Sequence, residues 1–232
     1  MKLSSKSLAL GAIFAASLLA SSAQASSVII SKDLTNPDVI PGLTGFSTTG
    51  AMMSGMEVTA VFSNNFSQTL SWKTTGAASG GVTSASGWGL NLDGDTFSAS
   101  WIFNITNDNL GQLMQIILSG TNGLTVFDTT EPSAGTPDSA QGADFAFVSG
   151  CLTCDVQVDY TDVVAISPND AVGDLFHTVT VDFGQTGIRF GQFEFRQDTD
   201  NDSRFTVPEP SGLALVGLAL AGLGLTTRRR QG

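Results

Sequence analysis

Short runs of alternating apolar and polar residues recur along the chain, and they limit its fold more strongly than any other feature. In His177–Phe183 (HTVTVDF), Val179, Val181 and Phe183 occupy every second position. Successive side chains of a β-strand point to opposite faces, so this spacing puts the three on one face. In Ile188–Phe195 (IRFGQFEF), Phe193 and Phe195 likewise share one face, opposite Gln192, Glu194 and the following Arg196. Each run predicts a strand with one buried and one solvent-facing side.

About ten β-rich runs are separated by clusters of Gly, Asn and Asp, which form turns. Asn109–Leu118 competes as a helix, but it lacks a clear cap and ends at Ser-Gly, so we interpret it as strand. With no helices alternating with strands, the pattern predicts an all-β antiparallel sandwich or jelly roll. The runs are Met56–Phe62, Phe66–Thr74, Trp88–Leu92, Thr96–Thr106, Leu113–Ser119, Leu124–Asp128, Asp144–Val148, Asp155–Tyr160, Phe176–Phe183 and Gly187–Arg196.

The N-terminus has the three parts of a secretory signal peptide. Two lysines precede the apolar run Leu8–Ala20, and Ala23-Gln24-Ala25 follows it. Small residues at Ala23 and Ala25 suit signal peptidase, which predicts cleavage between Ala25 and Ser26. Residues 1–25 are therefore a signal helix and not part of the folded body.

The C-terminus carries a second apolar segment, Gly212–Leu225, which holds no charged residue. As a helix it would be about 21 Å long, against a hydrocarbon core of about 30 Å. Arg228, Arg229 and Arg230 follow it, and the positive-inside rule places them in the cytoplasm. Residues 211–227 thus predict a helix that barely spans the inner membrane, with the body outside it and residues 228–232 as a basic tail.

The body between the two terminal segments is strongly acidic. From Ser26 to Val207, 20 acidic residues against five basic ones give a net charge of −15. Phosphate binding depends on Lys and Arg, so this charge excludes a nucleic-acid partner and repels anionic lipid. It keeps the exported body soluble and attracts divalent cations.

Cys151 and Cys154 are the two cysteines of the chain, in the sequence GCLTC. One such pair in an exported protein, with no nearby histidine, predicts a local disulfide and not a zinc site or a thioredoxin-like redox motif. No metal ligand set is therefore expected here.

Catalytic motifs are absent from the sequence. His177 is the single histidine, and neither a G-x-S-x-G elbow nor another nucleophile motif accompanies it. We interpret it as a strand residue that faces solvent or is loosely packed. A hydrolase built on two carboxylates is the remaining enzyme class, although nothing selects the pair. The sequence predicts a protein that is not an enzyme.

One acidic run resembles a calcium loop in its spacing. Asp198, Asp200 and Asp202 stand at positions one, three and five, with Glu209 at position twelve. Ser203 occupies the position where that loop needs glycine, and no helices flank it. We interpret the run as a solvated linker and weak calcium candidate, and we predict no obligatory cofactor.

Three tryptophans lie in predicted strands, namely Trp72, Trp88 and Trp101. Aromatic side chains on an exposed sheet face can stack on sugar rings, whereas tryptophans in a sandwich core are buried. Both interpretations stay open at this stage, because the sequence does not show which face each ring occupies.

The last residues of the chain resemble the PEP-CTERM sorting signal of Gram-negative bacteria. The resemblance rests on Val207-Pro208-Glu209-Pro210, the short apolar segment and the terminal arginines, in that order at the C-terminus. It implies a recognition motif at Pro208, Glu209 and Pro210, a transient membrane helix, and processing by exosortase after signal peptidase. It also implies an association with biofilm and exopolysaccharide.

These features divide the chain into a signal peptide (1–25), an exported β-sandwich (26–200), a linker with the PEP motif (201–210), the sorting helix and the basic tail. The leading hypothesis is a non-enzymatic structural or adhesive protein of the cell surface or extracellular matrix. A carbohydrate-binding module that recognises exopolysaccharide is the alternative, and a carboxylate-based hydrolase is the third.

Overall fold

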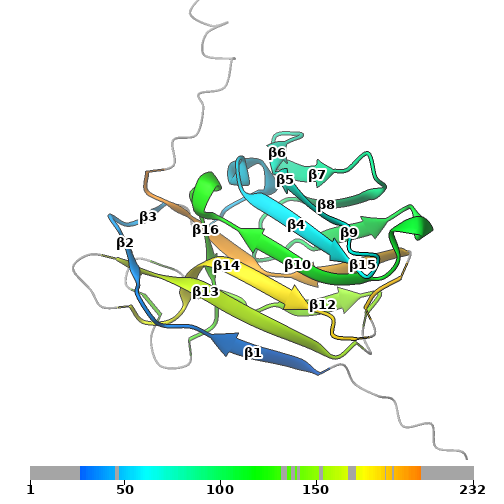
Figure 1. Cartoon of the computed structure of the whole chain (residues 1–232). Helices are drawn as coiled ribbons and strands as arrows, with labels where there is room; N and C mark the ends of the chain where they lie inside the picture. Colours follow the sequence, from blue (N-terminus) through cyan, green and yellow to red (C-terminus); the bar gives the residue numbers. More distant parts are fainter. Residues whose placement is uncertain are drawn as a thin grey trace, which may run out of the picture.

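The computed structural model describes residues 27–44, 47–131, 135–136, 139, 142–151, 154–166, 171–185, 187–189 and 191–204. These residues form two β-sheets that enclose a hydrophobic core (Figure 1). The all-β prediction is confirmed, although the described residues contain sixteen strands instead of about ten. Their helices are three short 3-10 turns, at Gly50–Met53, Asp108–Leu110 and Thr121–Gly123.

The larger sheet is built around one central antiparallel strand, β14 (Leu175–Asp182). One edge of β14 pairs with β10 and β11, and its other edge pairs with β13 (Val156–Ile166). Apart from β13 and the two strands that pair with it, the order of neighbouring strands in this sheet is β3 (Leu43–Thr44), β16 (Asp198–Asp202), β11 (Thr125–Asp128), β14, β10 (Leu113–Ser119), β4 (Glu57–Phe62) and β5 (Ser67–Ser71).

Two N-terminal strands depart from the antiparallel arrangement. β1 (Val28–Lys32) and β2 (Asp38–Ile40) both run parallel to β13, and they lie along its outer edge (Figure 1). Their ladder bonds attach the start of the folded body to its longest strand. The sequence pattern did not predict either strand, because both are short and largely exposed.

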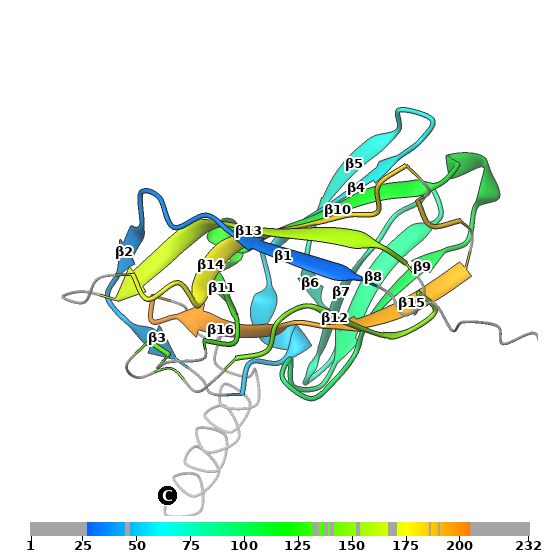
Figure 2. The ribbon, with the colours of Figure 1, turned by 90° about the horizontal axis from the view of Figure 1, so that it is seen from below.

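The smaller sheet has six strands, all antiparallel to their neighbours. Figure 2 shows it as a second layer beside the large sheet. Its order is β12 (Ala146–Ser149), β15 (Gly191–Arg196), β9 (Trp101–Ile105), β8 (Trp88–Asp93), β7 (Ser79–Thr83) and β6 (Lys73–Thr74).

The core fills the space between the two sheets, and the predicted alternation decides which side chains enter it. Val179 and Val181 of β14 are buried, as are Phe193 and Phe195 of β15. Directly opposed residues bring aromatic rings together across the small sheet. The pairs Phe103–Phe193 and Trp101–Phe195 stack with ring centroids 5.2 and 5.8 Å apart. Large buried rings of this kind dominate the stabilisation of a core.

The chain passes between the sheets at two buried residues. β5 belongs to the large sheet and β6 to the small one, and Trp72 lies between them. Gln197 likewise separates β15 of the small sheet from β16 of the large one, a continuous orange ribbon in Figure 2. Both residues are 0 % exposed. The predicted run Phe66–Thr74 is therefore split into β5 and β6, and the other additional strands, β1, β2, β3, β7 and β16, lie outside the predicted runs.

Gln197 is held on all sides by hydrogen bonds. Its backbone carbonyl accepts from Trp101 Nε1 at 2.9 Å, and its amide Oε1 accepts from the hydroxyl of Tyr160. The same hydroxyl accepts from the backbone N–H of Phe145 at 2.9 Å. Burial holds the pKa of Tyr160 well above its ordinary value, so the hydroxyl stays protonated and able to donate.

The predicted signal helix and sorting helix lie outside the described residues. Within the part that the structure describes, no helix has the length and apolar character needed to cross a membrane. The predicted linker, by contrast, lies partly inside the fold. The strand β16 continues to Asp202, so the sandwich extends beyond the predicted boundary at residue 200.

The Tyr160–Gln197 contact generates a stability prediction. Tyr160→Phe keeps the ring but leaves Gln197 Oε1 and the Phe145 N–H without this partner in a buried site. We expect the free energy of unfolding to fall by about 2 kcal/mol and Tm by about 4–8 °C. Urea and thermal unfolding of the exported protein, followed by circular dichroism, measure both.

Ser71→Ala is the matched control, because Ser71 is exposed on β5 and its loss should change stability by less than about 0.5 kcal/mol. Equal stability of Tyr160→Phe and Ser71→Ala would contradict the role given to the Tyr160 hydroxyl.

Candidate functional site

The three tryptophans do not form a sugar-stacking surface. Trp72, Trp88 and Trp101 are 0, 2 and 0 % exposed, and each indole N–H bonds within the protein. Trp72 donates to Gly50 O, Trp88 to Gln68 Oε1 and Trp101 to Gln197 O. The structure corrects the stacking hypothesis: Trp88 and Trp101 alternate with the solvent-facing residues of β8 and β9, and Trp72 is buried where the chain crosses between β5 and β6.

Those solvent-facing residues give the small sheet a polar outer face. On β8, buried Trp88, Leu90 and Leu92 alternate with Gly89 and Asn91 on the other side. Strand pairing continues this face across the neighbouring strands. One cross-strand row runs Thr83, Gly89, Asn104, Gln192, and the adjacent row runs Gly81, Asn91, Ile102, Glu194.

A cavity of about 330 Å³ opens on this face over β7 and β8. Gly81 and Gly89 contribute to its lining, and their missing side chains leave a depression in an otherwise regular sheet. Both glycines are required by close strand approach. A Cβ at Gly81 would lie 2.6 Å from Leu90 O, and one at Gly89 would lie 2.9 Å from Val82 O.

Polar side chains surround the glycine floor. Asn91, Asn104, Thr83 and Thr106 line the cavity, and across the described chain none of the four has a hydrogen-bond partner for its side chain. Their amide and hydroxyl groups can therefore both donate to and accept from a ligand. Sequence reasoning missed this site, although Gly-Thr and Gly-Asn alternation in two adjacent strands is a signal that could have indicated it.

The predicted calcium run lies in a different environment from the one expected. Asp198–Asp202 is the buried strand β16, hydrogen-bonded between β11 and β3, so the solvated-linker interpretation is wrong. The backbone amides need ladder partners once the run is buried, and β11 and β3 provide them. Asp202 forms an ion pair with Arg204. Among the described residues, no group of three or more acidic, histidine or cysteine side chains is placed to hold a metal.

Two buried carboxyls share a serine instead. Ser139 Oγ lies 2.9 Å from Asp128 Oδ2 and 3.0 Å from Asp200 Oδ2. A hydroxyl has one hydrogen and can donate it to only one carboxyl oxygen. The second contact is favourable when that carboxyl carries a proton of its own and donates it to the serine. The trio Asp128, Ser139 and Asp200, here called the proton clasp, therefore needs at least one acidic proton.

The surroundings of the clasp keep that proton bound. Burial, followed by the nearby Asp200 carboxyl, raises the pKa of Asp128 to about 8. Burial also raises the pKa of Asp200 to about 7, with Asp198 and Asp174 adding to the effect, and raises the pKa of Asp198 to about 6. A carboxyl surrounded by carboxyls and removed from water favours its neutral form.

Another aspartate, Asp174, binds a residue of the segment that follows β11. Asp174 is buried and accepts hydrogen bonds from the backbone N–H and the hydroxyl of Thr136, at 2.5 and 2.6 Å. Gly142 packs against Asp128 so closely that a Cβ there would lie 2.4 Å from Asp128 Oδ1. Thr136, Ser139 and Gly142, which follow β11, thus contact carboxyls of three chain segments.

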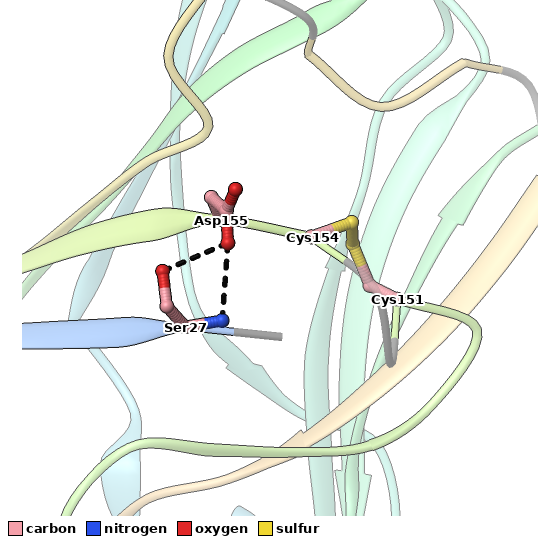
Figure 3. Close-up of a disulfide and its surroundings, with 4 residues drawn as sticks. All are labelled: Ser27, Cys151, Cys154 and Asp155. Carbon is pink, nitrogen blue, oxygen red and sulfur yellow. Dashed lines mark hydrogen bonds between the residues drawn. A yellow bond between two sulfur atoms is a disulfide. The ribbon is translucent and has the colours of Figure 1, made fainter. Parts of the chain in front are cut away.

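Cys151 and Cys154 form a disulfide, as the sequence predicts (Figure 3). Beside it, Ser27 donates from its backbone N–H and its hydroxyl to Asp155 Oδ1, at 3.1 and 2.8 Å. These bonds hold the pKa of Asp155 below its ordinary value. Ser27 is the second residue after the predicted signal cleavage, so the start of the exported protein is fastened next to the disulfide.

His177 is not a solvent-facing strand residue. It is 3 % exposed, with Nδ1 3.3 Å from Thr125 O and Nε2 3.3 Å from Asp38 Oδ2. The ring therefore lies between Thr125 of β11 and Asp38 of β2. No nucleophilic side chain is bonded to it among the described residues.

Comparison with known proteins finds one match. The family model of the PEP-CTERM protein-sorting motif matches residues 206–230. This segment contains Pro208, Glu209, Pro210 and the three arginines, all outside the residues that the structure describes. The motif indicates an exported protein with a membrane-anchored precursor, sorted by exosortase. Neither a curated protein nor a solved structure matches the chain.

The proton clasp predicts a stability that falls toward alkaline pH. The native carboxyls hold protons more tightly than the unfolded chain, whose aspartates have the ordinary pKa of 3.8. Stability is then fully present below that value and is lost as pH rises through about 6 to about 8. Asp128→Asn supplies a permanent neutral donor, so its Tm at pH 8 should exceed that of the natural protein by at least ~3 °C.

Thermal unfolding at pH 5, 6, 7 and 8 measures this difference. Asp108→Asn is the control, because Asp108 is exposed and should leave the pH dependence of Tm unchanged. A pH profile of Asp128→Asn as steep as that of the natural protein would rule out the clasp.

Proposed function

We propose that this protein is a non-enzymatic structural or adhesive component of the cell surface or extracellular matrix, delivered there by its sorting signal. The PEP-CTERM match at residues 206–230 is the observation that carries this proposal. The predicted signal peptide supports it, because a substrate of exosortase must first cross the inner membrane.

The disulfide and the acidic charge of the folded body are typical of exported proteins. A disulfide persists in an oxidising compartment, and here it closes the loop beside the start of the exported chain. The excess of 20 acidic over five basic residues keeps copies of the body apart in solution. Hydrogen bonds between paired strands, two packed sheets and stacked aromatic rings give it a rigid core.

Carbohydrate binding is the second candidate, and it now rests on a different surface. The unpartnered amides and hydroxyls around the Gly81–Gly89 depression support it, in place of the buried tryptophans. An exopolysaccharide would be the natural ligand for a matrix protein with such a site. Recognition of a polymer by a folded domain would also explain adhesion without catalysis.

A carboxylate-based hydrolase is less well supported. The carboxyls with the most strongly raised pKa values, Asp128 and Asp200, are 1 and 4 % exposed and are engaged by Ser139. General acid–base chemistry needs a carboxyl within reach of the substrate. These two are occupied in holding a loop.

Processing of the sorting signal tests the proposal directly. Intact-mass measurement of the protein recovered outside the cell should give a product that lacks the apolar segment and Arg228–Arg230. Replacing Pro208, Glu209 and Pro210 together by alanine should leave the full C-terminus in place and retain the protein in the inner membrane fraction.

Pro41→Ala, a proline change in the folded body, is the control and should not alter processing. Recovery of natural protein that retains both the apolar segment and the arginines would refute the sorting proposal. A deletion strain whose matrix is as cohesive as that of the parent would refute the structural or adhesive role.

A further inference from the structure

We infer that the depression over Gly81 and Gly89 is a binding site for a neutral, polyhydroxylated ligand, namely a segment of an uncharged polysaccharide. This inference rests on the carbohydrate-binding candidate and goes further, because it assigns the binding residues and the charge of the ligand. It depends on the shape of the site, its hydrogen-bonding groups and its charge.

The shape follows from strand pairing. Gly89 lies opposite Thr83 on β7 and opposite Asn104 on β9. Gly81 lies opposite Asn91 on β8 and opposite Lys73 on β6. Each missing side chain is thus flanked by longer ones on both neighbouring strands. The resulting volume of about 330 Å³ falls at the lower end of the range for small-ligand sites, which begins near ~300 Å³.

The hydrogen-bonding groups match hydroxyls. Asn91 and Asn104 each offer one acceptor and two donor hydrogens, and Thr83 and Thr106 each offer a hydroxyl. A sugar hydroxyl both donates and accepts, so it can satisfy either end of an amide. The glycine floor and the adjacent half-buried Ile102 present C–H surface, against which the apolar face of a sugar ring can pack.

Charge narrows the ligand class. None of the described residues that line the cavity is charged, and the nearby Lys73 and Glu194, in the same cross-strand row, carry opposite charges, so the site offers no net charge to offset the removal of a ligand charge from water. The body as a whole carries a net charge of −15, which repels acidic polysaccharides and nucleic acids. A neutral glycan pays neither penalty.

The close approach of β7 and β8 makes the site rigid. Because the Gly81 and Gly89 positions leave no room for a Cβ, the floor cannot be filled without moving the backbone of a neighbouring strand. Asn91 and Asn104 stand on paired strands in the middle of the sheet and not on loops. Preorganised groups on rigid elements reduce the ordering cost of binding.

Oligosaccharide binding by the exported protein tests the inference. The probes are a panel of neutral gluco-, galacto- and mannooligosaccharides and a matched panel of uronic-acid oligosaccharides, with affinity measured by titration calorimetry. We expect at least one neutral probe to bind. Asn91→Ala and Asn104→Ala should each weaken its Kd by about 3- to 10-fold, and the double variant should weaken it further.

Asn122→Ala is the matched control, since Asn122 is exposed on a 3-10 turn away from the small sheet and its loss should leave Kd unchanged. Circular dichroism and Tm establish that all variants fold, as expected for solvent-facing positions.

Binding by none of the neutral probes, binding by uronic-acid probes alone, or an unchanged Kd in the Asn91/Asn104 double variant would overturn the inference. These outcomes are independent of the processing experiment. A protein that is cut at its sorting signal and exported, yet binds no neutral probe, would leave the sorting proposal standing and remove the glycan site.

Discussion

The buried hydrogen bonds of Gln197 are the constraint on which the rest of the structure depends. Gln197 lies where the chain crosses from the small sheet to the large one, in the middle of the core. Among the described residues, the backbone makes no strand-to-strand hydrogen bonds with either sheet at this position. Backbone and amide groups left unpaired there would cost about 1–3 kcal/mol each. Tyr160, Trp101 and the carbonyls of neighbouring segments satisfy them, and in doing so they connect β13, β9 and β11 at one point. The sandwich can therefore use one continuous stretch of chain in both layers.

The same crossing explains the unusual position of the acidic strand. Once Gln197 has turned the chain into the large sheet, residues 198–202 must pair between β11 and β3 and become buried. The carboxyl of Asp200 lies near that of Asp128, and Ser139 bonds both. Burial raises the pKa values of Asp128, Asp198 and Asp200 in this region. On the outer face of the small sheet, by contrast, the side chains of Thr83, Asn91, Asn104 and Thr106 face solvent and have no hydrogen-bond partners within the described chain.

Much of the fold could be predicted because strand periodicity is local. Val179, Val181, Phe193 and Phe195 enter the core as their alternation requires. The same reasoning failed for Asp198–Asp202, since a run of polar residues indicates solvent unless a partner strand and neutralising protons are known. It could not place the tryptophans, because a period of two identifies which residues share a face without saying which face is buried. Nor could it find the glycine depression, which exists only when β7 and β8 are aligned.

The sequence by itself determined the all-β class, the disulfide pair and the sorting signal at residues 206–230, because each depends on residues that are adjacent or closely spaced along the chain. The tertiary structure alone decided which side of each strand is buried, which aspartates Ser139 joins, and where unpartnered amides gather over two glycines. These properties depend on residues distant in sequence, such as Asp128 and Asp200 or Gly81 and Asn104. Only sheet pairing and the crossing at Gln197 bring them within hydrogen-bonding distance or onto one surface.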